Sequence, residues 1–289
     1  MRFSIVITTF QRRHIVFRAI DSALAFAVAR EGDTEVVVVD DASQDGTADM
    51  IQAAYVKELE SRRLILLRRH VNAGQMVAKN EGAQAARGDW VIILDSDDEL
   101  LPCAATAIPD VAAEYPNAPL LFFRCENEKG RLMEPRASPG PLPFSALVMG
   151  TLGQHCPVIK RTAFLACPYD EDLRGFVSLA YFRMVQRFGP AIISDAVVRR
   201  YYTVGEDRLC KLANRLGRAD AMARGFTRWL NEFGRMLSWR RRVGLHFRWA
   251  CYRLAASLPP AFIRILTNNR SEGSTTRALD RLAPPLVRR

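Results

Sequence analysis

Acidic residues follow two of the short apolar runs in this 289-residue sequence. Asp40-Asp41 comes directly after one run, and Asp95-Ser96-Asp97-Asp98 comes after another. Three carboxylates within four residues would repel one another on a bare surface, and a divalent cation would neutralise them. Mg²⁺ and Mn²⁺ prefer oxygen ligands, commonly one or two carboxylates together with the phosphates of a substrate. The alternative is a pair of polar turns, because aspartate is common in turns and at the start of helices.

The elements that must position these acids are predicted from alternating apolar runs and helical stretches. Strands are expected at Phe3–Ile7, Glu35–Val39, Leu64–Leu67, Trp90–Leu94, Val158–Lys160 and Ile192–Val198. Helices are expected at Arg12–Arg30, Thr47–Glu60, Gly74–Ala86 and Phe176–Phe188, and a loop at Glu134–Pro143. The regular alternation in the first third of the chain predicts an α/β fold with a mostly parallel sheet flanked by helices.

Ligands bind such sheets beyond the carboxyl ends of the strands. Thr8-Thr9-Phe10 follows the first predicted strand, so a hydroxyl and an aromatic ring are expected beside the two acidic clusters. The first strand is not followed by G-x-G-x-x-G, and G-x-x-x-x-G-K-[ST] is absent, which excludes a dinucleotide fingerprint and a P-loop. A nucleotide in this place would therefore have its phosphates held by a metal ion.

Composition places the chain among ordinary globular proteins, with 49% hydrophobic and 25% charged residues. Six cysteines include no C-x-x-C pair, which argues against a zinc ribbon or a thioredoxin-like site. No apolar run reaches the roughly 18 residues of a membrane-spanning helix, and the apolar start is too short for a signal peptide. A cytoplasmic location is expected.

Five segments in this order and spacing resemble family 2 of the glycosyltransferases. They are Ser4–Phe10, Val38–Thr47, Asn72–Gly74, Lys79–Gly82 and Gly88–Asp98. The resemblance is dense over residues 4–102 and weaker to about residue 209. It implies a GT-A-like (Rossmann-like) fold and a metal-dependent, inverting enzyme that uses a nucleotide diphosphate sugar.

By this resemblance, the donor site is expected to combine nucleotide and metal contacts. Thr8, Phe10, Asp40 and Asp41 would hold the base and ribose, Lys79 would contact the diphosphate, and Asp95-Ser96-Asp97 would match the family's D-x-D element. Asp95 would face the ribose, Asp97 would bind Mn²⁺ or Mg²⁺, and Asp98 would support the metal site. The other reading is that Asp40-Asp41 forms a capped turn and that Lys79 lies on a solvated helix face.

The general base is missing from its expected place. The family usually has Phe/Tyr-Asp-Glu followed by a Glu-Asp pair whose Asp is the base. Tyr169-Asp170-Glu171 matches the first motif, but Val177-Ser178 stands where the pair is expected. Candidate bases are Asp172, which we favour, with Asp170, Glu171 and Asp207 as alternatives. His155 would also serve, although a lone histidine is more often structural.

The C-terminal part of the chain is strongly basic. Residues 208–289 carry a net charge of +14, whereas residues 1–207 carry −4. Trp239, Val243, Phe247, Ala250 and Leu254 recur at helical spacing on one face, with arginines at its edge. A basic amphipathic helix suits an anionic membrane surface. The alternatives are a helix whose apolar stripe packs on the catalytic domain, and an RNA-binding segment.

These observations predict three parts. Residues 1–110 would bind the nucleotide sugar, residues 111–207 would bind a glycan or lipid-linked acceptor, and residues 208–289 would form a basic, largely helical extension, with residues 208–266 touching the inner face of the cell membrane. The expected function is glycosyl transfer in cell-surface polysaccharide synthesis. The alternative from another class is a catalytically silent nucleotide-sugar-binding scaffold. A nucleotidyltransferase is disfavoured because no Gly-rich loop follows the first strand.

Overall fold

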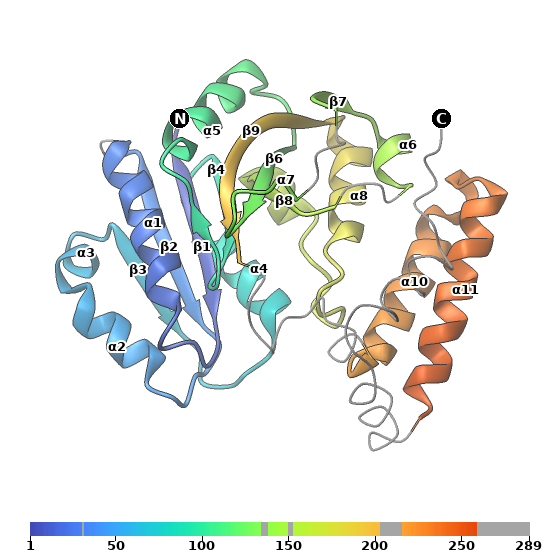
Figure 1. The fold of residues 1–289 in the computed structure, drawn as a ribbon, viewed down its shortest axis with the longest axis horizontal. Helices are drawn as coiled ribbons and strands as arrows, with labels where there is room; N and C mark the ends of the chain where they lie inside the picture. The colour runs from blue at the N-terminus through green and yellow to red at the C-terminus, as the bar shows by residue number, and fades with distance from the viewer. Residues whose placement is uncertain (31, 134–137, 150–152, 203–215, 259–289) are drawn as a thin grey trace.

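Nine strands form one curled, mixed sheet in the computed structural model, which describes residues 1–30, 32–133, 138–149, 153–202 and 216–258 (Figure 1). Their bounds are β1 Phe3–Thr9, β2 Thr34–Asp40, β3 Leu64–Arg68, β4 Trp90–Asp95, β5 Glu99–Leu100, β6 Leu120–Asn127, β7 Gly140–Leu142, β8 His155–Lys160 and β9 Ala191–Tyr201. The strand order is β3-β2-β1-β4-β8-β6-β9-β5, and β7 pairs with β9.

Helices cover both faces of this sheet (Figure 1). Their bounds are α1 Val16–Ala29, α2 Thr47–Ala54, α3 Val56–Glu60, α4 Gln75–Ala85, α5 Ala104–Glu114, α6 Phe144–Leu147, α7 Arg161–Ala166, α8 Ser178–Phe188, α10 Ala219–Phe233, η1 Gly234–Met236 and α11 Trp239–Ala256. Within the described residues, no helix is both long enough and apolar enough to cross a bilayer.

The parallel half of the sheet brings three strand ends into line. β1 pairs in parallel with β2 and with β4, and β2 with β3. In this register Thr8 of β1 lies level with Val39 on one side and with Asp95 on the other. The predicted parallel strands are therefore confirmed, and the acids that follow them meet at one edge of the sheet.

β1, β2 and β4 are buried on both faces because their residues alternate between two cores. Val6, Val37 and Val39 belong to the core shared with α4 and α8, while Ile5 and Val36 belong to the core shared with α1 and α5. The first of these cores needs a close approach at Gly82 of α4, where a Cβ atom would lie 2.4 Å from Val6 Cγ1. Only glycine lets α4 lie this near the sheet, which places the residues of α4 beside the strand ends.

The second half of the sheet is mixed. β8 runs antiparallel to β4 and to β6, whereas β9 runs parallel to β6. Two sequence predictions need correction. The helix expected at Thr47–Glu60 is interrupted at Tyr55, whose backbone is not helical and whose ring stacks on Phe17. The loop expected at Glu134–Pro143 contains β7, a short edge strand; residues 134–137 lie outside the described part.

The C-terminal described segment is a helical hairpin. α10 and α11 lie side by side, joined through η1, at the end of the molecule far from α1 and α2 (Figure 1). The hairpin attaches to the rest of the protein through aromatic packing of α10: Phe226 contacts Phe176, with ring centroids 5.4 Å apart, and Trp229 contacts Phe182 at 4.9 Å. Gly225 allows this approach, since its Cβ position is 2.5 Å from the Phe176 ring.

Candidate active site

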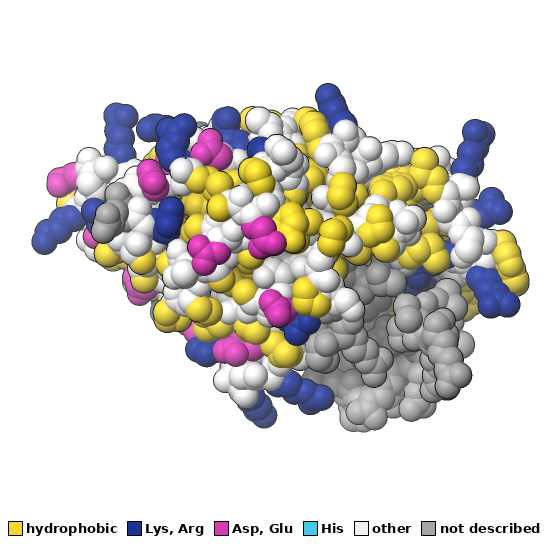
Figure 2. Space-filling model, turned by 90° about the horizontal axis from the view of Figure 1, so that it is seen from above, with side chains coloured by type: hydrophobic (Ala, Val, Ile, Leu, Met, Phe, Trp, Pro, Cys, Tyr) yellow, Lys and Arg dark blue, Asp and Glu magenta, His cyan; other side chains and the backbone are white. Residues whose placement is uncertain are grey.

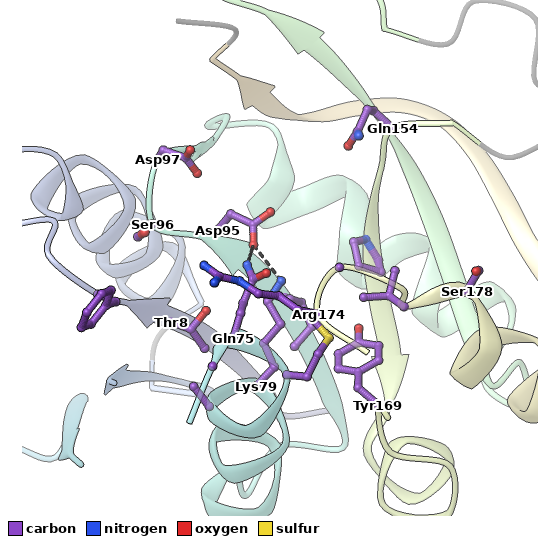
Figure 3. A pocket seen from close by; sticks show the side chains of 18 of the residues that line it. Thr8, Gln75, Lys79, Asp95, Ser96, Asp97, Gln154, Tyr169, Arg174 and Ser178 are labelled. Atoms are coloured by element: carbon purple, nitrogen blue, oxygen red, sulfur yellow. Dashed lines mark hydrogen bonds and ion pairs between the residues drawn. The ribbon is translucent and has the colours of Figure 1, made fainter. Parts of the chain in front are cut away.

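A cavity of about 780 Å³ opens at the carboxyl ends of β1 and β4. The loop after β1 and the first turns of α4 line one side, and the start of β8, the N-terminus of α8 and the residue range 174–175 line the other. Figure 3 shows Thr8, Lys79 and Asp95 on the first side and Tyr169 and Ser178 on the second. The cavity thus lies between the two parts predicted at residues 1–110 and 111–207.

The side of the cavity formed by the loop after β1 contains three of the predicted nucleotide contacts. Thr8 is buried, and its hydroxyl has no hydrogen-bond partner. Phe10 also lines the cavity and is 41% exposed, so its ring is accessible to a ligand. Asp41 accepts hydrogen bonds from the backbone N–H groups of Ala73 and Gly74 at 3.0 and 2.8 Å. These contacts hold the Asp41 carboxylate at the cavity wall.

Asp40 lies outside the residues that line the cavity. Its carboxylate accepts hydrogen bonds from the backbone N–H of Ser43 at 3.0 Å and from the Ser43 hydroxyl at 2.5 Å. This is the turn that the alternative reading of the acidic pair describes. The structure therefore brings Asp41, and not Asp40, to the site.

Lys79, which is buried, and Asp95, which is partly exposed, form an ion pair in the cavity. Lys79 Nζ lies 2.8 Å from Asp95 Oδ1, and the Gln75 side chain donates to the same oxygen at 3.1 Å (Figure 3). Lys79 is 6% exposed, which excludes the solvated helix face. Gln75 was not predicted; its signal was its place one turn before Lys79 on the same helix face.

The three acids after β4 separate into two environments. Asp95, Ser96 and Asp97 line the cavity. Asp98 is 1% exposed, faces Arg199 at 3.6 Å, and accepts a hydrogen bond from the backbone N–H of Tyr202. Burial raises the pKa of Asp98 to about 7. Among the described residues, no three His, Cys, Asp or Glu side chains converge as a metal cluster. Asp95 and Asp97 are thus the acids of this loop that a cation in the cavity would reach.

The position expected for the general base lies at the cavity but carries no acid. Val177 and Ser178 line it at the N-terminus of α8. His155, the first residue of β8, lies on the same wall and is 6% exposed, and neither ring nitrogen has a hydrogen-bond partner. Burial and the positive charges of Arg199 and Arg124 lower the pKa of His155. The neutral form of the imidazole is therefore favoured over the protonated one.

The acids near the expected base position serve a different contact in this structure. Asp170 pairs with Arg183 at 2.8 Å and with Arg228 at 2.7 Å, and Asp172 pairs with Arg228 at 2.8 Å. Neither acid lines the cavity. Because Arg228 belongs to α10, these pairs attach the helical hairpin to the loop that precedes α8.

The remaining candidates for the base give no support from geometry. Glu171 accepts a hydrogen bond from the Asn80 side chain at 3.2 Å and does not line the cavity. Asp207 lies outside the described residues.

Asn80 also holds Tyr169, donating to its carbonyl at 2.9 Å and accepting from its N–H at 3.0 Å. Asn80 therefore joins α4 to the opposite wall of the cavity.

Four arginines at the cavity were not predicted as site residues. They line it together with Lys79 and are Arg12, Arg174, Arg199 and Arg218. Arg199 is buried, and its guanidinium donates to the carbonyl of His155 at 3.0 Å. A concentration of positive charge suits an anionic ligand such as a diphosphate. No local motif marks these arginines, since they come from four separate segments of the chain.

Comparison with protein families decides the classification. The model for "Glycosyl transferase family 2" matches residues 4–156, more than half of the chain. The chain belongs to this family. The match includes β1, β4 and the start of β8, and so it covers the strand ends that line one side of the cavity.

Curated relatives include a protein named for succinoglycan biosynthesis and a named glucosyltransferase. The chain is 44% identical over 98 residues to "Succinoglycan biosynthesis protein ExoO" of Rhizobium meliloti (34% of this chain, 26% of the relative). It is 31% identical over 113 residues to "GalNAc(5)-diNAcBac-PP-undecaprenol beta-1,3-glucosyltransferase" of Campylobacter jejuni (39% and 35%). The chain thus covers well under two thirds of the length of these relatives.

Solved structures share the fold over most of the chain. S. aureus TarS 1-349 in complex with UDP-GlcNAc matches with a TM-score of 0.67 and 17% identity, covering 86% of this chain and 73% of that one. Mannosyltransferase PcManGT from Pyrobaculum calidifontis, in complex with GDP-Man and Mn2+, matches with a TM-score of 0.64 and 19% identity, covering 99% and 84%. The α/β sheet flanked by helices is therefore the fold of these transferases, as expected.

Proposed function

We propose that this protein transfers a glycosyl group from a nucleoside diphosphate sugar to a hydroxyl of a glycan or lipid-linked acceptor, with inversion, during synthesis of a cell-surface polysaccharide. One observation carries the proposal: Thr8, Lys79 and Asp95 meet in a single cavity at aligned strand ends. Family membership and the names of the relatives support the reaction class.

The donor would lie along the first side of the cavity. The exposed ring of Phe10 would stack on the base. The unpartnered Thr8 hydroxyl would donate or accept a hydrogen bond, and the Asp41 carboxylate would accept hydrogen bonds from N–H or O–H groups of the base and ribose. Lys79 would contact the diphosphate, and Asp95 the ribose. Ser96 lines the cavity beside them, whereas Asp40 would act only through the turn that precedes α2.

A divalent cation fits the acids of the cavity. Asp95 and Asp97 offer carboxylate oxygens, and Mg²⁺ or Mn²⁺ is typically bound by one or two carboxylates plus substrate phosphates. When bound, the cation would stabilise the negative charge of the departing diphosphate. Asp98 would keep the loop in place through its contact with Arg199. A solved relative in fold was crystallised with GDP-Man and Mn2+.

For the general base we propose His155 in preference to Asp172. Among the described cavity-lining residues, Asp41, Asp95 and Asp97 are assigned to the donor, and His155 is an imidazole on the opposite wall whose neutral form is favoured. The acceptor oxygen would bond to the anomeric carbon while the bond from that carbon to the diphosphate oxygen breaks. The electron pair leaves with the nucleoside diphosphate, and the hydroxyl proton goes to His155.

A thermal-shift screen of UDP, GDP and dTDP, each with and without Mn²⁺, tests the donor site. A ligand that binds the native state alone raises the melting temperature, so one nucleotide is expected to stabilise the protein more strongly with Mn²⁺ than without it. Absence of any response would refute the proposal. Transfer assays with the corresponding sugar nucleotides follow: binding without turnover would support the silent scaffold.

A further inference from the structure

One face of α11 exposes large apolar side chains. Trp239, Val243, Phe247 and Leu254 are 65%, 60%, 47% and 68% exposed, respectively. With 100° between successive residues of a helix, they form a stripe less than a quarter-turn wide, and Ala250 lies within it. We call these five residues the apolar face of α11. Exposed apolar stripes of this kind on soluble proteins usually mark an interaction site.

The opposite side of α11 packs on α10. Leu245, Tyr252 and Ala255 are buried, and the Tyr252 ring stacks on Phe226 with centroids 5.7 Å apart. Arg241, on this side too, lies over the Trp229 ring at 5.4 Å. Within the described residues, the alternative in which the predicted apolar stripe packs on the catalytic domain is therefore wrong. The helix is anchored by its other side, and the apolar face remains available.

Positive charge borders the apolar face. α11 contains five arginines and no acidic residue. Arg240 is exposed on one edge, with its guanidinium 5.4 Å from the Trp239 ring, and Arg242 and Arg253 are exposed on the other edge. Figure 2 shows basic and hydrophobic side chains next to one another at the end of the molecule where Figure 1 draws α11. Arginines beside an apolar strip with a tryptophan match the chemistry of an anionic bilayer surface.

The hairpin also connects this face to the cavity. Arg218, which precedes α10, and Met222 of α10 line the cavity. The ion pairs of Arg228 with Asp170 and Asp172 fix α10 to the loop before α8. A contact made by α11 would therefore hold the cavity at a defined distance from the surface that α11 touches.

We propose that the apolar face of α11 docks on an anionic lipid bilayer, with the helix lying in the interface and its arginines on lipid headgroups. The proposal deepens the proposed function, because it would bring the cavity to an acceptor held in the membrane. A second copy of the chain, or residues 259–289, are the other occupants that the experiment separates from lipid.

Vesicle co-sedimentation of the full-length protein tests this proposal. The probes are vesicles of phosphatidylcholine alone and of phosphatidylcholine with phosphatidylglycerol. One variant, the face variant, combines three substitutions in the apolar face: Trp239→Ser, Phe247→Ser and Leu254→Ser. A matched control replaces three exposed apolar residues elsewhere, Val28→Ser, Val71→Ser and Leu165→Ser. The wild type and the control are expected to sediment with anionic vesicles. The face variant is expected to have an affinity for these vesicles that is lower by roughly tenfold or more.

The charge requirement has its own pair of variants. Arg240→Gln, Arg242→Gln and Arg253→Gln together should weaken binding to anionic vesicles and make it less dependent on salt. The control changes three exposed arginines of the other end, Arg62→Gln, Arg63→Gln and Arg87→Gln, and should bind like the wild type.

Three outcomes would overturn the proposal. The first is equal sedimentation of the face variant and the wild type. The second is no binding of the wild type to either vesicle, as expected if residues 259–289 cover α11. The third is a lipid-independent dimer that the face variant abolishes. Vesicle binding without a thermal response to any nucleotide would keep this inference and refute the proposed function. A thermal response to a nucleotide without vesicle binding would keep the proposed function and refute this inference.

Discussion

Lys79 Nζ lies 2.8 Å from Asp95 Oδ1, and the two residues come from α4 and from the end of β4. Both are assigned to the donor site, so a bound diphosphate would meet a lysine that is already held in place by its neighbour. Preorganisation of this kind reduces the side-chain entropy lost on binding. The ion pair also keeps the Lys79 ammonium group inside the cavity and away from solvent.

Replacing Lys79 should weaken binding of the nucleoside diphosphate. Lys79→Met removes a charge-assisted hydrogen bond, which is worth about 1.5–3 kcal/mol and corresponds to roughly a 10- to 150-fold rise in Kd. Isothermal titration calorimetry with the best nucleotide from the thermal-shift screen measures the change. Lys57→Met, an exposed lysine of α3, is the matched control and should leave Kd unchanged. Equal Kd values for the two variants would remove Lys79 from the site.

Two neighbouring acids should respond differently to substitution. Asp97→Asn is expected to abolish the additional stabilisation by Mn²⁺, since Asp97 lines the cavity. Asp98→Ala should keep the Mn²⁺ response but lower the free energy of unfolding by about 3 kcal/mol, because it leaves the buried Arg199 without its carboxylate. Thermal shift and urea denaturation read the two effects. Loss of the Mn²⁺ response in both variants would mean that Asp98 takes part in metal binding after all.

The assignment of the base is tested by one pair of variants. His155→Gln should lower kcat at least about 100-fold while the nucleotide Kd stays near that of the wild type. Asp172→Asn should leave kcat nearly unchanged and cost about 1 kcal/mol of stability at most, because its ion pair with Arg228 is half-exposed. The reverse pattern would restore Asp172 as the base.

The pH dependence follows from the lowered pKa of His155. The base must be neutral, so kcat/KM should stay constant as the pH falls to 6.5 and decline only below that value, where the folded pKa lies. The folded protein binds this proton less readily than the unfolded chain does, so stability should also fall as the pH drops through the folded pKa. A decline in kcat/KM centred above pH 6.5 would exclude His155. His155→Gln should lose that acidic limb.

Asn80 should contribute to stability across the cavity. Asn80→Ala leaves the buried backbone groups of Tyr169 without their partners, and we expect a loss of about 2–3 kcal/mol in the free energy of unfolding. Gln84→Ala, an exposed position on the same helix, should change it by less than about 0.5 kcal/mol. Urea denaturation checks both variants. Similar values for the two would mean that the contact between α4 and the Tyr169 loop adds little.

Local pattern was enough to predict the strands and their ends. β1, β2 and β4 are continuous apolar runs bounded by polar residues, and a strand buried on both faces shows this pattern whatever it packs against. Because parallel strands end at one edge, the pattern also predicted that Thr8, Asp41 and Asp95 would meet. The helix periodicity of α11 predicted its apolar stripe in the same way.

Only the tertiary structure shows which partner each acidic side chain has, because the partners come from distant segments of the chain. Asp40 and Asp41 are adjacent aspartates, yet they have different partners. Asp40 is held by Ser43, and Asp41 is held by the turn before α4, which only the folded sheet brings near. Asp172 is occupied by Arg228, a residue more than 50 positions away, and no local pattern encodes that ion pair. Each helix satisfies its own backbone hydrogen bonds, so these bonds do not determine which side of α11 packs on α10. That side is determined by side-chain contacts, among them the aromatic rings that meet between the two helices.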